Sequence, residues 1–200
     1  MALVSTKDGT LDKLEVVKWT KLYHYLKRVP KITYAFGWTG EDGELLAILT
    51  IGKPASNALC EGICGKENKQ YVLEINRICA KPELNIPLSQ FVGMVLRSLP
   101  NLILVSYADS KMNHVGVIYQ ALNFIYTGAT RARTDIKTDS HSRHYTKAES
   151  YPDRVERSSK HRYCIFIGCK KFKKDMRVAL KYPVQDYPKG KIQHYDIDWQ

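Results

Sequence analysis

The stretch 101–128 constrains the fold more than any other part of this sequence. Residues 101–107 form a nearly continuous apolar run, which is typical of a strand buried inside a sheet. Residues 114–122 then have helical spacing, with Ile118, Ala121 and Leu122 on the inward side, and a further strand follows directly. This strand–helix–strand unit predicts an α/β (α+β) fold with a mixed, partly parallel central sheet flanked by helices.

Weaker patterns place the remaining elements around this unit. Before the central unit we expect a helix at 21–29 that ends before Pro30, a hairpin at 32–38 and 45–51, an irregular loop at 54–70, a strand at 71–79 and a helix from Pro87. After the central unit we expect a strand at 161–168 and then a helix with Phe172, Met176 and Leu180 on its inward side. Residues 129–160 have no clear period and predict a basic insertion before the last strand. We expect a single domain over 1–200 with an extended C-terminal tail at 182–200.

The chain is strongly basic, with 31 lysines and arginines against 20 aspartates and glutamates and a formal net charge of +11. A surplus of this size indicates a polyanionic partner, above all nucleic acid, although a merely soluble basic surface is the alternative. Basic and aromatic side chains interleave in the C-terminal half, which suits contacts to phosphates and bases. The residues expected to contact DNA are Arg131, Arg133, Lys137, Arg143, Tyr145, Lys147, Arg162, Lys170, Lys171 and Lys174.

Other patterns exclude whole classes of protein. No apolar run approaches the roughly 20 residues of a membrane-spanning helix, and the N-terminus lacks the apolar core of a secretory signal. Five cysteines, an odd number, fit a reducing cytoplasm. Cys60 and Cys64 are half of a possible metal site, but no second pair has matching spacing, so ordinary thiols are expected. We therefore expect a cytoplasmic protein without a membrane partner.

Polar residues gather where the central strand ends. Ser106 and Asp109 lie at its carboxyl end, which in α/β proteins opens onto the ligand crevice, and Tyr119 lies on the following helix. Ser106 can hold an oxyanion, Asp109 can act as a base and Tyr119 as an acid. The alternative is structural, with Tyr119 a packed helix residue and Asp109 a helix cap.

Arg77 lies inside an otherwise apolar strand. An arginine is costly to bury unpaired, so it has to meet a carboxylate, a phosphate or an open cleft. Glu74, three residues earlier, lies on the opposite face of an ideal strand, and the two side chains are not expected to meet.

The central unit resembles the GNAT superfamily of acetyltransferases, in which a helix ending in Tyr-x-x-x-Gly-Phe stands between two strands. Here the helix ends in Tyr119-x-x-x-Asn123-Phe124, with asparagine in place of glycine. Asparagine tolerates the left-handed backbone that such a turn requires.

A longer pattern resembles the phage Mom family of GNAT-like DNA-modifying proteins, over about Leu22 to Gly190. It comprises His24-Tyr25, Glu74-x-x-Arg77, Ser106-x-Ala108-Asp109, His114-x-Gly116-x-Ile118-Tyr119-Gln120-Ala121-x-Asn123-Phe124-x-Tyr126-x-Gly128, His161-Arg162-Tyr163, Lys181-Tyr182-Pro183 and Tyr187-Pro188-Lys189. The resemblance implies conversion of adenine in double-stranded DNA to its carbamoylmethyl derivative at the exocyclic amine. This modification shields phage DNA from host restriction enzymes, in the cytoplasm of the infected bacterium.

The resemblance also implies roles for individual residues. Asp109 accepts a proton from the adenine amine or orients it, and Ser106 holds the donor carbonyl. Tyr119 protonates the leaving group. Arg77 contacts a phosphate or carboxylate. His24 and Tyr25, both on the predicted first helix, wall the pocket for an unstacked base.

Two kinds of group donor are compatible with the sequence. GNAT enzymes hold the pyrophosphate of coenzyme A in a glycine-rich loop before a helix, yet residues 80–91 contain no glycine. The residues expected near a bound donor are Lys81, Ser89 and Asn123. Acetyl-CoA or another acyl-CoA is one donor, and glycyl-tRNA is the other, because a glycyl group on the amine can rearrange through a five-membered ring to the carbamoylmethyl product. A metal held by His24 and Asp109 is not expected, since no third ligand follows from the spacing.

Two alternatives remain open at this stage. One is a GNAT-type N-acyltransferase that acts on another nucleobase, a small amine or a protein. The other is a catalytically silent DNA-binding protein that uses the fold as a scaffold. The oligomeric state, monomer or dimer, is open too.

Overall fold

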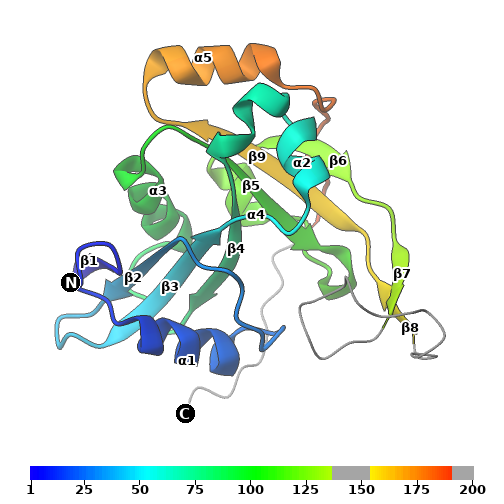
Figure 1. Ribbon diagram of the computed structural model, residues 1–200. Coiled ribbons are helices and arrows are strands. Elements are labelled where there is room, and N and C mark those ends of the chain that lie inside the picture. The colour runs from blue at the N-terminus through cyan, green and yellow to red at the C-terminus, as the bar shows by residue number, and fades with distance from the viewer. Residues whose placement is uncertain (137–153, 191–200) are drawn as a thin grey trace.

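A computed structural model describes residues 1–136 and 154–190. Its centre is a seven-stranded mixed sheet in the order β1-β2-β3-β4-β5-β9-β6 (Figure 1). The strands are β1 (Ala2–Ser5), β2 (Tyr34–Thr39), β3 (Leu45–Gly52), β4 (Val72–Ala80), β5 (Leu102–Asp109), β6 (Ile125–Ala129) and β9 (Lys160–Ile167). Only β4 and β5 pair in parallel, and the other neighbours are antiparallel. The expected mixed, partly parallel sheet is confirmed.

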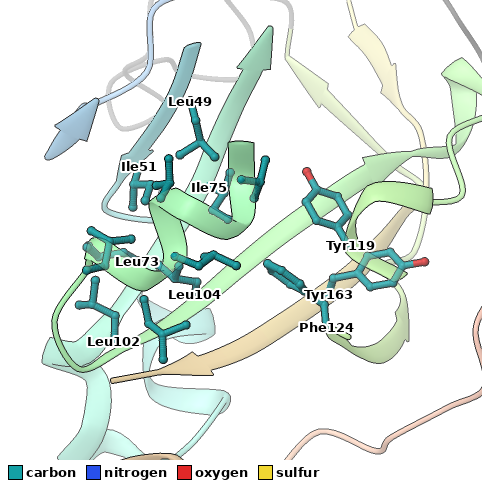
Figure 2. Close-up of a cluster of buried hydrophobic side chains, with 14 of the residues drawn as sticks. Leu49, Ile51, Leu73, Ile75, Leu102, Leu104, Tyr119, Phe124 and Tyr163 are labelled. Carbon is teal, nitrogen blue, oxygen red and sulfur yellow. The ribbon is translucent and has the colours of Figure 1, made fainter. Parts of the chain in front are cut away.

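Helices cover both faces of this sheet. The helices α1 (Lys13–Tyr23), α2 (Asn57–Gly62) and α5 (Lys170–Ala179), with the 3-10 helix η1 (Lys66–Tyr71), pack on one side, here called the α1 face. The helices α3 (Leu88–Ser98) and α4 (Val117–Ala121) pack on the other, the α3 face. Figure 2 shows the core of the α3 face, in which Leu73, Ile75 and Leu104 meet Tyr119, Phe124 and Tyr163.

The parallel pair β4–β5 is only briefly hydrogen-bonded. Its register runs from Val72 opposite Ile103 to Glu74 opposite Val105 and stops there. Both strands continue, β4 to Ala80 and β5 to Asp109, without pairing with each other. The sheet is therefore split along the carboxyl-terminal halves of its two central strands.

The first helix differs from the predicted one. It spans Lys13–Tyr23, is capped by the Asp12 side chain and buries Val16, Trp19, Thr20 and Tyr23, whereas Leu22 is exposed. The prediction of a helix at 21–29 was wrong because the apolar spacing there belongs to a loop that packs on the sheet. His24 is the C-terminal cap residue in an extended conformation, so His24 and Tyr25 follow the helix rather than lie on it.

Other elements are shorter or more regular than expected. The predicted loop at 54–70 contains α2 and most of η1. Helix α4 begins three residues later than predicted, after the short 3-10 helix η2 (Ser110–Met112), and Ala121 is exposed while Tyr119 is buried. The strands β7 (Arg133–Ile136) and β8 (Arg154–Arg157) form a separate two-stranded ribbon within the predicted insertion.

Residues 182–190, the part of the predicted tail that the structure describes, follow the edge strand β6 without forming a strand of their own. The Gln185 amide donates to the Tyr126 carbonyl, and the Tyr187 hydroxyl donates to the Phe124 carbonyl. In the described part of the chain, no helix is long and apolar enough to cross a membrane.

Candidate active site

The split between β4 and β5 opens a cleft of about 1390 Å³. Its walls come from the loop after α1, the start of α2, the second half of β4, the end of β5, the start of α4 and the base of the β7–β8 ribbon. The residues that line it belong to both faces of the sheet, so the cleft passes through the split. Typical small-molecule sites have volumes of about 300–1,000 Å³, so this cleft has room for more than one group.

A β-bulge in β4 determines which side chains enter the cleft. Thr50 of β3 lies opposite Arg77 and Ile51 opposite Ile75, so Asn76 has no partner. The extra residue reverses the alternation of side chains along the strand. Glu74 and Arg77 therefore share the α1 face and both line the cleft. The expectation that they lie on opposite faces was wrong, because it assumed an unbulged strand.

Glu74 is the functional candidate that the sequence reasoning missed. It lies at the point where the two strands part, and burial raises its pKa to about 6 although the charges of Arg77 and Lys160 oppose the shift. A carboxyl with this pKa is largely ionised near neutral pH and still basic enough to take up a proton. The available signal was an acidic residue inside an apolar strand, the same signal that drew attention to Arg77.

Arg77 holds the loop after α1 against β4. Its Nε and one terminal nitrogen donate to the Arg28 carbonyl, at 3.2 and 2.9 Å, and the other donates to the carbonyl of Asn76. These contacts satisfy much of the guanidinium with backbone oxygens, and its charge still acts on Glu74 and His24.

His24 is neutral in this site. Burial, assisted by the charges of Arg77, Lys160 and His114, lowers its pKa to about 3. Its Nδ1 accepts from the Leu26 amide at 3.1 Å, so the ring proton is on Nε2. The ring stacks on Tyr25, and Tyr25 contacts His114 edge to face across the open end of the split. Both predicted wall residues, His24 and Tyr25, line the cleft.

Asp109 lies behind the cleft rather than on its surface. Its carboxylate accepts from the Lys111 amide, the Ser158 hydroxyl and the Lys160 ammonium, the last at 3.2 Å. Burial alone raises its pKa, but the Ser158 hydrogen bond and the Lys160 charge outweigh burial and leave the pKa below the usual value. This environment favours the structural alternative, in which Asp109 caps η2 and positions Lys160, which does line the cleft.

Ser106 and Tyr119 form a buried pair at the apex of the split. The Ser106 hydroxyl donates to the Ile75 carbonyl at 2.9 Å and lies 2.7 Å from the Tyr119 hydroxyl, from which it accepts. Burial raises the pKa of Tyr119 to about 12 despite the Ser106 bond. Ile75 is the first residue of β4 beyond the segment that pairs with β5, and its carbonyl accepts from the Ser106 side chain instead of from a β5 amide. The Ser106–Tyr119 pair therefore favours separation of the two strands.

The residues predicted near a donor are not gathered in one place. Lys81 lines the cleft but forms an ion pair with Glu44 and lies over the Trp19 ring. Ser89 lies in the first turn of α3, whose N-cap residue, Pro87, makes no side-chain cap. Asn123 forms the turn after α4 with a φ of 57°, which confirms the left-handed conformation expected there, and it lies at a separate small hollow beside α5.

The predicted DNA-contacting residues fall into two groups. Arg131, Arg133 and Arg162 line the cleft, together with Arg157 of the ribbon. Arg162 is also held by the protein, since it donates to Thr127 and its guanidinium lies 3.8 Å from the centre of the Tyr182 ring. Lys170, Lys171 and Lys174 lie exposed on α5. Lys137, Arg143, Tyr145 and Lys147 are outside the described residues.

Among the described residues, no group of three or more His, Cys, Asp or Glu side chains is arranged to hold a metal ion. His24 and Asp109, the pair considered from the sequence, have their acceptor atoms engaged by the Leu26 amide and by Lys111, Ser158 and Lys160, respectively.

The fold and the cleft define a class of mixed α/β proteins with a ligand site in a split between two parallel central strands. The chain belongs to the Mom protein family, whose sequence model matches residues 9–189. The comparison with curated proteins gives no match.

Solved acetyltransferase structures have a similar chain path. A putative acetyltransferase from Acinetobacter baylyi ADP1 has 15% identity and a TM-score of 0.48, over 83% of this chain and 92% of that one. An N-acetyltransferase from Staphylococcus aureus Mu50 has 10% identity and a TM-score of 0.43, over 77% and 95%. A GNAT superfamily phosphinothricin acetyltransferase from Sinorhizobium meliloti, in complex with AcCoA, has 12% identity and a TM-score of 0.40, over 80% and 71%.

Proposed function

We propose that this protein is a transferase that places an acyl-derived group on the exocyclic amine of adenine in double-stranded DNA. The product is the carbamoylmethyl, or glycinamide, derivative, and in a phage genome it protects against host restriction enzymes. The observation that carries the proposal is the cleft in the split of the sheet, which is lined by Glu74, with a pKa near 6, and by neutral His24, in a chain of the Mom family.

The surroundings of the cleft support a nucleic-acid substrate. Arg131, Arg133 and Arg157 lie at its rim, where the phosphates flanking a flipped base come closest. The stacked rings of His24 and Tyr25 provide a flat wall against which an unstacked purine can lie. The volume of about 1390 Å³ accommodates this base beside the reacting end of a donor.

The proposed chemistry assigns the base role to Glu74. Its carboxylate takes a proton from the adenine amine as the nitrogen attacks the donor carbonyl carbon, and it returns this proton to the leaving oxygen or sulfur as the bond from that atom to the carbonyl carbon breaks. The Nε2–H of His24 donates to the carbonyl oxygen as negative charge develops there. In this scheme Asp109 positions Lys160, and Ser106 with Tyr119 keeps the two strands apart.

We further propose glycyl-tRNA as the donor. Transfer of the glycyl group gives an amide on the purine amine and frees the 3′ hydroxyl of the RNA. The glycyl amino group then attacks the purine carbon in a five-membered ring, and the bond from that carbon to the original nitrogen breaks. The original nitrogen becomes the terminal amide, one proton moves from the attacking amine to it, and no oxidant or reductant is needed.

Nucleoside mass spectrometry of DNA from cells that express the protein tests the function. A carbamoylmethyl-adenine peak with the wild type, and none with Glu74→Gln, is the expected result. Another adduct supports a transferase with a different acceptor, and unmodified DNA that is nevertheless bound supports the silent DNA-binding alternative. Purified protein with duplex DNA and either labelled glycyl-tRNA or labelled acetyl-CoA identifies the donor, since label enters the DNA only from the one in use.

A further inference from the structure

Helix α5 carries a charge pattern that works against its own stability. Five of its ten residues are basic, Asp175 alone is acidic, and no acidic residue is present in the first turn. Four lysines fall within the first five positions, at the end of a helix where the partial charge of the backbone is positive. Like charges three and four residues apart repel one another as well.

The rest of the described chain does not neutralise this pattern. Phe172 and Met176 are buried, while Lys170, Lys171, Lys173, Lys174 and Arg177 are exposed. None of the described carboxylates lies within salt-bridge distance of these five cations. A local arrangement that costs stability without a compensating contact is typical of a surface that binds a partner.

The surface of α5 is separate from the basic rim of the cleft. The ribbon strand β8 ends just before β9, and α5 begins just after it, so the two basic elements lie at opposite ends of this strand (Figure 1). Eight residues of β-strand span roughly 26 Å. Helix α2 packs against α5 and also lines the cleft, and its Glu61 is paired with Lys69, so an acidic residue lies on the element between the two basic surfaces.

We propose that the exposed face of α5 binds the phosphate backbone of the RNA that carries the donor group, while the rim arginines bind the target DNA. The proposal rests on the proposed function, in which two polyanions must be bound at the same time. Two basic surfaces at opposite ends of β9, with the Glu61–Lys69 pair on the elements between them, fit two nucleic acids bound side by side. The face exposes no aromatic side chain, which fits recognition of a paired RNA stem by its backbone, and an unpaired 3′ end extends from the stem to the cleft.

Binding measurements with two probes test this assignment. The probes are an RNA hairpin that ends in an unpaired ACCA strand and a DNA duplex of equal length. We expect Lys170→Gln/Lys171→Gln/Lys174→Gln to weaken RNA binding at least tenfold and to reduce the slope of log affinity against log salt by about 2 to 3. DNA affinity should stay within twofold.

The matched control is Arg131→Gln/Arg133→Gln/Arg157→Gln at the rim of the cleft, which removes the same charge, should weaken DNA binding and should leave RNA binding within twofold. A triple lysine variant that loses DNA and RNA affinity equally would mean one continuous track and overturn the proposal. Unchanged RNA affinity would mean a merely solvated helix face and overturn it too.

Thermal stability checks the premise that the lysines of α5 destabilise the helix. Because the lysines repel one another and the helix terminus, the triple variant should melt about 2–4 °C above the wild type at low salt. A lower Tm would remove the physical basis of the proposal. Failure of the proposed function can be distinguished from failure of the α5 proposal. The first leaves the DNA unmodified in the mass-spectrometry test, whereas the second is seen only in the RNA-binding measurement.

Discussion

Burial of Glu74 in the cleft changes the acidity of its carboxyl group. Burial raises its pKa from 4.5 to about 6, while Arg77 and Lys160 keep enough positive charge nearby to prevent a larger shift. A carboxyl with a raised pKa stabilises the fold most below its ordinary pKa. That contribution is lost as the pH rises from about 4.5 through about 6. Near neutral pH the protein therefore maintains a buried charge at a cost to its stability.

The substitution Glu74→Gln should separate the stability cost from activity. At pH 7.5 we expect an unfolding free energy equal to or up to roughly 2 kcal/mol above that of the wild type, because the buried charge is gone. At pH 4 the difference should vanish. Urea unfolding at both pH values measures this, and a variant less stable at pH 7.5 would contradict it.

The same residue predicts the pH dependence of modification. The wild-type rate should rise with pH through about 6 and then level off, because the carboxylate has to be ionised to accept a proton. His24 adds no step between pH 5 and 8, since its pKa is about 3. Loss of the base should cost about 10²–10⁴-fold in rate. A Glu74→Gln variant with the wild-type rate and profile would assign the base elsewhere.

Ser106 and Tyr119 should act as one unit in stability. Tyr119→Phe removes the hydrogen bond to Ser106, and Ser106→Ala leaves the Ile75 carbonyl without its side-chain donor. Each change should cost about 1–3 kcal/mol, and the double variant should cost less than the sum, because the two share one network. A double-mutant cycle from urea unfolding checks this. Strictly additive losses would show that the two hydroxyls act independently.

At the scale of elements, β4 and the turn after α4 shape the site. The bulge at Asn76 turns Glu74 and Arg77 to one face, and Asn76 itself is held by the Thr50 hydroxyl and the Lys31 carbonyl. The turn at Asn123 lets β6 follow α4 directly, with the Phe124 amide bonded to the Tyr119 carbonyl. One extra residue and one left-handed residue thus fix where Glu74 and Tyr119 lie.

The left-handed conformation of Asn123 gives a simple test of this turn. Asn123→Ala should lower the unfolding free energy by about 1 kcal/mol, because a Cβ without a compensating polar group is strained at a φ of 57°. Asn123→Gly should be neutral or slightly stabilising, as glycine adopts this conformation without strain. Thermal unfolding of both variants measures the difference. Equal effects of alanine and glycine would mean that the turn is not under strain.

At the scale of the whole molecule, the net charge of +11 predicts DNA binding that weakens steeply with salt. Neutralising Arg131, Arg133 and Arg143 together should reduce the salt slope by about 2 to 3. Fluorescence anisotropy over a salt series measures the slope. An unchanged slope would place the DNA interface on another surface. Arg143 is outside the described residues, so Arg131→Gln/Arg133→Gln is the pair whose place at the cleft is known.

Local patterns in the sequence determined much of the architecture. The strand at β5, the hairpin of β2 and β3, the helix α3, the last strand β9 and the amphipathic α5 all follow from periodicity and turn residues, and the structure has them close to their predicted bounds. The motif that indicated the Mom family runs over most of the chain and depends on residue identities rather than on a period, and the match to the family model confirms the family. These helices and strands can be predicted from the sequence because burial of one face of an element places apolar residues at a regular spacing.

Tertiary structure alone decided which of the polar residues enter the cleft. The spacing of Glu74 and Arg77 indicated opposite faces, and only the bulge, forced by pairing with β3, brings them together. Asp109 and Tyr119 had the right residue types for catalysis, but their hydrogen bonds go to Ser158, Lys160 and Ser106 from distant parts of the chain. The pKa of Glu74 also depends on the folded chain, because it is raised by burial and lowered by the charge of Lys160, which is 86 residues later in the sequence. A sequence specifies which groups are present, whereas their burial and neighbours, which set the chemistry, exist only once the chain has folded.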